Sequence, residues 1–237
     1  MGDGAGPDYR RIAEAVGAHG LVARGGFHPE APDGVPALAD GRPTRTLIII
    51  GSVGGSAWPS FALSRERSDG SADPLDRWTR RILLAIAREF DAAALFPFGG
   101  PPHLPFQRWA QRAEPVAPSP LGILIHPDHG LWHAYRGALA FARQLDLPAR
   151  GDRPRACDAC TTKPCLSACP VGAFADSGYN VARCIDHVVA PAGQACRSGG
   201  CRARLACPVG RHLAHDEAQA RFHMDAFVAA RQRSLRR

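Results

Sequence analysis

The chain has 237 residues, of which 45% are hydrophobic, and its formal net charge is +7 at pH 7. This length and composition allow a buried core and either one large domain or one medium and one small domain. No apolar run approaches the ~18 residues that would cross a bilayer. Lys163 is the only lysine, and the arginines form no long basic run, which argues against a nucleic-acid partner. We therefore expect a cytoplasmic protein that works away from the membrane.

The amino-terminal part of the chain predicts a helix followed by a buried strand. Residues 12–19 have the pattern of a short amphipathic helix, and their charge excludes an export signal after Tyr9-Arg10-Arg11. Thr46–Ile50 is mostly β-branched, as expected of a buried strand. The glycine-rich residues Gly51–Ser56 that follow fit either a plain turn or a loop whose amides approach a polar ligand group.

A second helix is expected from Asp73 onward, with Asp73 as N-cap and Pro74 in the first turn. Its apolar residues recur at helical spacing and so share one face: Leu75, Trp78, Ile82, Leu83, Ile86 and Phe90. The apolar segment Ala92–Phe96 comes next. Pro97–Pro102 is too rich in proline for a central strand or helix, so we expect a surface loop.

The next segment predicts a strand, a turn and a helix. Leu121–His126 has the composition of a strand, and Pro127–Gly130 interrupts it before a helix expected over residues 131–145. Residues 147–156 combine proline, glycine and charge, as a linker does. Beyond the cysteines, residues 212–233 have the composition of a closing helix.

The segment from His126 to Gly137 reads HPDHGLWHAYRG. It resembles the H-P-x-x-G-x-W-x-A-x-R-G motif of the cobalamin-processing proteins of the CblC type. The resemblance implies a flavin-reductase-like or nitroreductase-like α/β fold that binds cobalamin in a base-off form and removes its upper axial ligand. The residues that it assigns to the corrinoid pocket are His126, Gly130, Trp132 and Arg136.

Other interpretations of these residues remain open. Trp132 could be an ordinary core residue and Arg136 a structural hydrogen-bond donor. The D-x-H-x-x-G signature of proteins that supply a lower axial histidine is absent, so the resemblance implies no such ligand. Because related folds also bind FMN, a flavin is the alternative cofactor for this domain.

All eight cysteines lie between residues 157 and 207, in two runs of four that each end in Cys-Pro-Val-Gly. The first run is Cys157, Cys160, Cys165 and Cys169, and the second is Cys184, Cys196, Cys201 and Cys207. Two quartets that end in Cys-Pro predict two [4Fe-4S] clusters, and in two-cluster ferredoxins the cysteine before proline binds the other cluster. Cys207 is therefore assigned to the first cluster and Cys169 to the second.

Two other roles for these cysteines compete with iron-sulfur clusters. Zinc sites favour pairs of closely spaced cysteines, and only Cys157 and Cys160 form such a pair cleanly. Disulfide scaffolds are normally short, secreted and rich in cysteine throughout, whereas residues 1–156 contain none.

The carboxy-terminal half resembles the epoxyqueuosine reductases, in which a corrinoid domain precedes a two-cluster ferredoxin module; Arg183-Cys184-Ile185 is similar to the start of their second quartet. Reductive dehalogenases share this pairing of corrinoid and clusters. These resemblances imply an α+β chain in which a nitroreductase-like α/β sandwich is followed by a bacterial-type dicluster ferredoxin domain. We expect a corrinoid-binding domain over residues 1–148, a ferredoxin-like domain over 149–212, and a closing helix and basic tail over 213–237.

The predicted function is an iron-sulfur oxidoreductase that binds cobalamin and reduces it or removes its upper ligand. An electron-transfer ferredoxin without corrinoid is the first alternative. An epoxyqueuosine-type tRNA-modifying reductase is disfavoured, because the chain is short and has no recognisable helical-repeat extension. The sequence assigns no catalytic residue, electron donor or oligomeric state.

Overall fold

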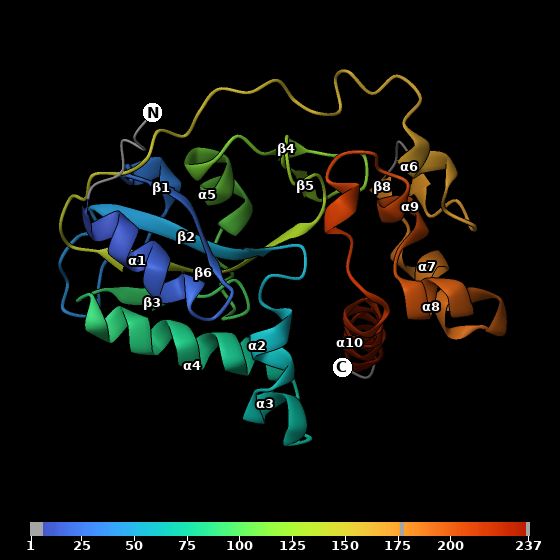
Figure 1. The fold of residues 1–237 in the computed structure, drawn as a ribbon, viewed down its shortest axis with the longest axis horizontal. Coiled ribbons are helices and arrows are strands. Elements are labelled where there is room, and N and C mark those ends of the chain that lie inside the picture. The colour runs from blue at the N-terminus through green and yellow to red at the C-terminus, as the bar shows by residue number, and fades with distance from the viewer. Residues whose placement is uncertain (1–6, 176–177, 236–237) are drawn as a thin grey trace. The chain divides into compact units, whose positions relative to one another are not determined.

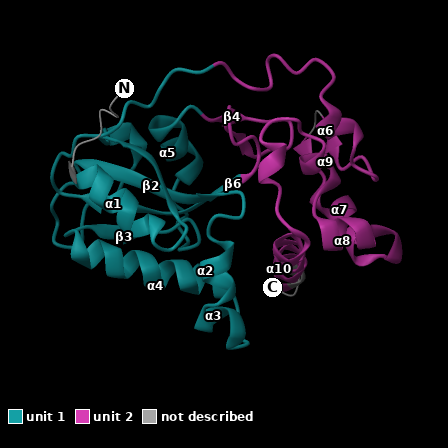
Figure 2. Cartoon of the chain, in the orientation of Figure 1, with its two compact units in different colours: residues 1–115, 133–153 teal, residues 116–132, 154–237 magenta. Residues whose placement is uncertain are grey.

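The computed structural model describes residues 7–175 and 178–235 (Figure 1). The chain divides into two compact units, coloured separately in Figure 2. Unit 1 comprises residues 1–115 and 133–153, and unit 2 comprises residues 116–132 and 154–237. No helix in the described ranges combines the length and apolar character needed to span a membrane.

Unit 1 is built on an antiparallel sheet of four strands in the order β1-β2-β6-β3. Its strands are β1 (Val22–Phe27), β2 (Thr46–Val53), β3 (Ala93–Leu95) and β6 (His133–Phe141). Its helices are α1 (Pro7–Gly17), the 3-10 helix η1 (Ala31–Asp33), α2 (Trp58–Ala62), α3 (Arg65–Ser68), α4 (Pro74–Glu89) and α5 (Phe106–Ala113). The fold of this unit is mixed α/β.

Strand β2 is the predicted buried strand, and helices cover both of its faces. Leu47 and Ile49 pack with Phe106 and Trp109 of α5 in one hydrophobic cluster. Side chains alternate along a strand, so Ile48 points to the opposite face of the sheet. There α4 packs against β3 and β6 (Figure 1). Because neither face meets water, the strand is a continuous apolar run instead of an alternating one.

The helix expected over residues 131–145 is wrong, because the chain forms strand β6 there. This segment pairs with β2 along one edge and with β3 along the other. The run Gly137–Phe141 is buried at every position, and such short apolar runs do not distinguish a strand from a buried helix by periodicity. Alanine favours helices, but pairing with strands on both sides overrides that preference.

The other predicted elements of unit 1 need smaller corrections. Helix α4 starts at Pro74 as expected, but the side chain of Asp73 makes no capping hydrogen bond and its backbone has φ of 50°. The expected glycine loop begins later than predicted, because Gly51–Val53 still belong to β2. The apolar segment after α4 forms β3, and Pro97–Pro102 is irregular as expected.

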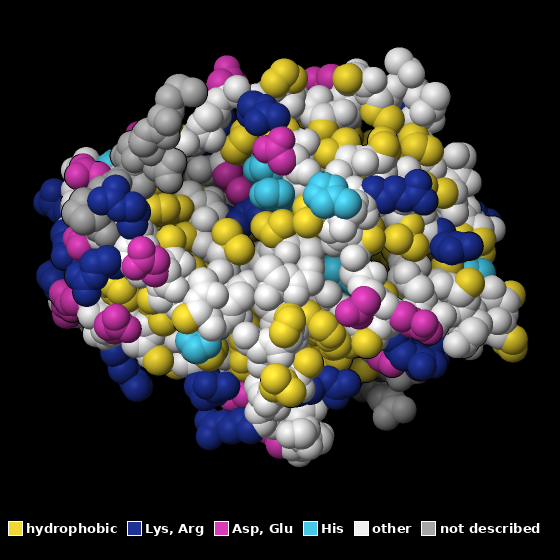
Figure 3. All heavy atoms as spheres, viewed as in Figure 1, with side chains coloured by type: hydrophobic (Ala, Val, Ile, Leu, Met, Phe, Trp, Pro, Cys, Tyr) yellow, Lys and Arg dark blue, Asp and Glu magenta, His cyan; other side chains and the backbone are white. Residues whose placement is uncertain are grey.

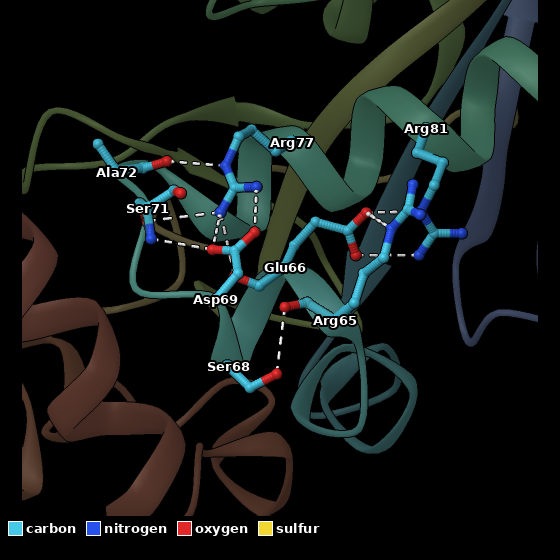
Figure 4. A network of polar contacts seen from close by, with 8 residues as sticks. All are labelled: Arg65, Glu66, Ser68, Asp69, Ser71, Ala72, Arg77 and Arg81. Atoms are coloured by element: carbon cyan, nitrogen blue, oxygen red, sulfur yellow. Dashed lines mark hydrogen bonds and ion pairs between the residues drawn. The ribbon is translucent and has the colours of Figure 1, made fainter.

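Arginine–carboxylate pairs fasten α3 to α4 (Figure 4). Arg81 donates two hydrogen bonds to the buried carboxylate of Glu66, at 2.6 and 3.0 Å, and Arg65 contacts the same group. Arg77 binds Asp69 through both terminal nitrogens. On the face shown in Figure 3, basic and acidic side chains are interspersed over unit 1. Ion pairs within the fold therefore neutralise several of the arginines that contribute to the positive net charge.

Apart from helix α10, unit 2 consists of short elements. The strands are β4 (Ala117–Pro118), β5 (Leu124–Ile125), β7 (Phe174–Ala175) and β8 (Gly178–Tyr179). The helices are α6 (Pro164–Ser167), α7 (Val181–Val189), η2 (Pro191–Gly193), α8 (Gln194–Gly199), α9 (Arg202–Leu205), η3 (Arg211–Leu213) and α10 (Glu217–Leu235). The strand expected over residues 121–126 is limited to β5.

The compact units do not follow the predicted domain boundaries. Residues 116–132 precede β6 in the chain but pack with the cysteine-bearing segments of unit 2. Helix α10 is part of the same unit, because it packs on α7 and α8. The expected linker, residues 147–156, has almost no regular structure, and the carboxy-terminal boundary of unit 1 falls within it.

Candidate metal centres and the adjoining loop

All eight cysteines lie in unit 2, and each is a free thiol. They separate into two groups by position. The first thiol group is Cys157, Cys160, Cys165 and Cys207, which lie close enough that neighbouring thiols raise the pKa of Cys157, Cys165 and Cys207. The second thiol group is Cys169, Cys184, Cys196 and Cys201, which interact in the same way. The disulfide interpretation is therefore not supported.

Each group contains a cysteine from the other run of the sequence. Cys207 ends the second run but lies with the first three cysteines, and Cys169 ends the first run but lies with the last three. Gly172 and Gly210 close the two Cys-Pro-Val-Gly turns with φ of 56° and 66°. This left-handed conformation suits glycine, so the two copies turn the chain in the same way.

The first thiol group surrounds a cavity of about 30 Å³. Its other lining is mainly apolar and comes from Pro120, Ile125, Ala156, Lys163, Pro164, Pro208 and Val209. Burial raises the pKa of the thiols of Cys157, Cys165 and Cys207, and the neighbouring thiols raise it further. Without metal these groups stay protonated at neutral pH, so binding iron would release protons.

Backbone amides point at sulfur in both groups. The amide of Ala173 donates to Cys169 Sγ at 3.3 Å. Amides of Leu166, Arg202 and Val209 oppose the rise in pKa of Cys165, Cys196 and Cys207 respectively. A donor aimed at sulfur favours the thiolate form, which is the form that binds metal. The residues present therefore fit a thiolate-bound cluster.

In the described part of the chain, no group of three or more His, Cys, Asp or Glu side chains is arranged so that it could hold a metal ion. A zinc site and an iron-sulfur cluster differ in how their cysteine ligands must be placed. A zinc ion needs four ligands at about 2.0–2.3 Å from one point. In a cubane cluster, each thiolate binds a separate iron.

The loop after β5 is folded tightly and rests on the second Cys-Pro-Val-Gly turn. His126 and Gly130 exchange backbone hydrogen bonds of 2.9 Å. His126 Nδ1 accepts from the amides of Asp128 and His129, at 3.1 and 3.2 Å, so this ring holds the turn together. Gly130 has φ of 57°, and a side chain there would overlap the carbonyl oxygen of Val209. The loop therefore lies directly against the turn that carries Cys207.

Trp132 and Arg204 extend this contact. Trp132 is buried, and the guanidinium of Arg204 lies 4.2 Å from the centre of its ring. Arg204 also donates to the carbonyl of Leu131 at 2.7 and 3.1 Å. Burial lowers the pKa of Arg204 to about 10, which leaves it charged at neutral pH. Arg204 lies in the segment between Cys201 and Cys207, so it connects the cysteine turns to the loop.

The four residues assigned to a corrinoid pocket are divided between the units. His126, Gly130 and Trp132 belong to unit 2, whereas Arg136 lies on β6 of unit 1. Arg136 forms an ion pair with Asp76 and donates to Thr79. These contacts match the alternative interpretation of Arg136 as a structural hydrogen-bond donor.

Sequence reasoning missed two residues at these centres. Burial raises the pKa of Tyr179, and the neighbouring side chain of Cys184 raises it further. Arg204 is the second. The sequence does mark both residues. Tyr179 is the only tyrosine among the cysteine runs, and Arg204 stands midway between Cys201 and Cys207.

No protein-family model matches the chain, and no curated protein sequence matches it. Among solved structures, the chain is similar to the crystal structure of CblC from C. elegans, a B12-trafficking protein described as a homologue of human MMACHC. The two share 12% sequence identity with a TM-score of 0.48, over 93% of this chain and 96% of that chain. At these values the similarity is one of general outline.

Proposed function

We propose that unit 2 is a ferredoxin-like module that holds two [4Fe-4S] clusters, one on each thiol group. The exchange of Cys169 and Cys207 between the two groups carries this proposal. Two-cluster ferredoxins make the same exchange, since the cysteine before proline binds the other cluster. The duplicated left-handed turns and the amides directed at sulfur support it.

We further propose that the clusters serve a bound cobalamin, which the protein reduces or frees of its upper axial ligand. The resemblance of residues 126–137 to the motif of the CblC type supports this step. The packing of Gly130 on Val209 also supports it, because the motif loop then lies beside the turn that carries a cluster ligand. Cobalamin, once bound, would supply a cobalt centre that accepts electrons.

The residues of the chain would perform three tasks in this function. The thiolates bind iron, and the amides directed at sulfur stabilise their negative charge. The apolar lining around the first thiol group excludes water from its cluster. Arg204 holds the carbonyl of Leu131, so the motif loop keeps its position when the cluster changes charge.

An electron-transfer ferredoxin without corrinoid is the second candidate, and one observation favours it. Arg136 is already bound to Asp76 and Thr79, and the other three motif residues belong to unit 2. The motif would then have a structural role, with His126 and Trp132 fixing the loop on the cysteine turns.

Anaerobic purification followed by titration with cobalamin separates the candidates, because clusters, flavin and corrinoid have different absorption spectra. We expect eight irons and eight sulfides per chain, and a change in the cobalamin spectrum on addition of dithionite and protein. Arg136→Lys should weaken cobalamin binding. The matched control is Arg77→Lys, which alters another arginine–aspartate pair of unit 1. Clusters without any cobalamin binding would favour the electron-transfer ferredoxin, and bound flavin would identify FMN as the cofactor in place of cobalamin.

A further inference from the structure

The cavity of the first thiol group has one charged lining residue, Lys163. The rest of its lining consists of the cysteines of that group and of apolar residues. Lys163 is the only lysine of the chain, and it is exposed. Among the described residues, no carboxylate forms an ion pair with it. The cavity therefore carries an exposed positive charge that its own chain does not neutralise.

The backbone of Lys163 has an uncommon conformation. Its φ and ψ are 40° and 57°, in the left-handed region that residues with side chains rarely adopt and that is found more often at functional sites. Its carbonyl accepts a hydrogen bond from the amide of Leu166 at 3.0 Å, at the start of helix α6. The side chain makes no capping hydrogen bond to this helix. The turn thus holds the backbone of Lys163 at the cavity and leaves the ammonium group available to a partner.

The thiols that come shortly before Lys163 in the sequence are the more accessible ones of the group. Cys157 and Cys160 are half-buried, whereas Cys165 and Cys207 are buried. The residues that surround the two accessible cysteines in the sequence, 158–159 and 161–163, are all exposed. Another protein can therefore approach the proposed cluster here without displacing the core of the unit.

The charges around these thiols favour an acidic partner. Residues 155–163 carry two positive side chains, Arg155 and Lys163, and one negative side chain, Asp158. All three are exposed. Opposite charge on a partner speeds its encounter with such a surface and helps to orient it. The apolar lining residues then offer the uncharged contact that the centre of an interface requires.

From these observations we propose that the rim of the cavity, defined by Cys157, Cys160 and Lys163, is the docking surface for an acidic protein that carries single electrons. The inference rests on the proposed clusters and names the kind of electron donor that serves them. In the docked pair the reduced carrier loses one electron and the cluster of the first thiol group gains it, and no atom is transferred. Electron-transfer encounters of this kind bury little surface, under about 1,200 Å².

The test uses the full chain with both clusters and reduced flavodoxin, an acidic one-electron carrier. Lys163→Gln removes the charge and should slow the second-order reduction of the clusters about threefold or more at low salt, because steering by opposite charge is lost. The difference should shrink as salt is added, since exposed charges are then screened. Arg221→Gln is the matched control and should leave the rate unchanged, because Arg221 is an exposed residue of α10 that does not line the cavity.

Cross-linking with a carbodiimide gives a second readout. This reagent joins an amine to a carboxylate, and the chain has one lysine, so the cross-linked peptide should contain Lys163. Lys163→Arg keeps the positive charge but has no amine that the reagent couples. It should therefore retain the rate of reduction and lose the cross-link.

Several results would overturn the inference. Reduction of Lys163→Gln at the rate of the unaltered protein at low salt is one, and a cross-link through the amino terminus alone is another. Equal slowing in Arg221→Gln would show that net charge acts instead of this rim. Loss of the first cluster in Lys163→Gln would also count against docking, since a docking residue is not required for assembly. Failure of the unaltered protein to bind eight irons would instead refute the proposed function.

Discussion

Glu66 shows how a single carboxylate is stabilised by the arginines that are abundant in this chain. This residue of α3 is buried, and its carboxylate receives hydrogen bonds from Arg81 and Arg65. The hydrogen bonds from Arg81 are the largest cause of its low pKa, which falls from 4.5 to about 2. A carboxyl group whose pKa is depressed by folding stabilises the folded state above its unfolded pKa.

We predict that Glu66 contributes to acid sensitivity between about pH 4.5 and 2. Above this window the contribution is fully present, and it disappears as the pH falls through the folded pKa. Glu66→Gln should lower the free energy of unfolding at pH 7 by about 1 kcal/mol, because Arg81 is partly exposed and its bonds are screened. The difference from the unaltered protein should then shrink toward pH 2. Urea unfolding at pH 7, 4 and 2.5 measures both effects, and a constant difference at all three values would contradict the assignment.

Individual residues were predictable from the sequence to different degrees. The grouping of the cysteines follows from spacing, since a Cys-Pro pair marks the ligand that crosses to the other cluster. The role of Arg204 does not, because its contacts with Leu131 and Trp132 depend on a loop from a distant part of the chain.

Among the elements, β6 and the loop before it depend most on distant parts of the chain. The preference of Ala138 and Ala140 for helix is opposed by pairing with β2 and β3, which come from residues far away in sequence. Strand β2 was predictable because its β-branched run agrees with its surroundings. The loop from His126 to Gly130 was visible as a turn, but its contact with Val209 joins residues some 80 positions apart, as the residue numbers show.

We predict that Gly130→Ala disrupts this contact and loosens the cluster proposed for the first thiol group. The added methyl group would overlap the Val209 carbonyl oxygen and force the loop or the Cys207 turn to move. Gly122→Ala is the matched control, since Gly122 also has a positive φ, of 75°, but has no atom within 4 Å of an added Cβ. The control should lose only about 1 kcal/mol from backbone strain. Iron release to a chelator over time compares the two variants, and equal rates would show that the contact is unimportant for the cluster.

At the scale of the whole molecule, the two units have cores of different chemical kinds. The core of unit 1 is hydrocarbon, built from residues such as Leu47, Ile49 and Trp109. Both cores of unit 2 include cysteines: Cys165 and Cys207 are buried in one, and Cys196 in the other. The sequence indicated such a division, because all the cysteines lie in one part of the chain. It did not indicate that residues 116–132 would belong to the unit that contains the cysteines.

We predict that removing the iron of the proposed clusters unfolds unit 2 and leaves unit 1 folded. Bound metal contributes its binding free energy to the segments that supply the ligands, and short helices such as α6 and α9 are too brief to be stable alone. The sheet of unit 1 needs no metal, because its strands are buried under helices on both faces. Hydrogen exchange before and after chelation under anaerobic conditions provides the measurement. Amides of β2 and β6 should stay protected, while those of α7 and α8 should exchange at rates approaching those of an unfolded chain. Loss of protection in both units together would show that the clusters stabilise the whole chain as one cooperative structure.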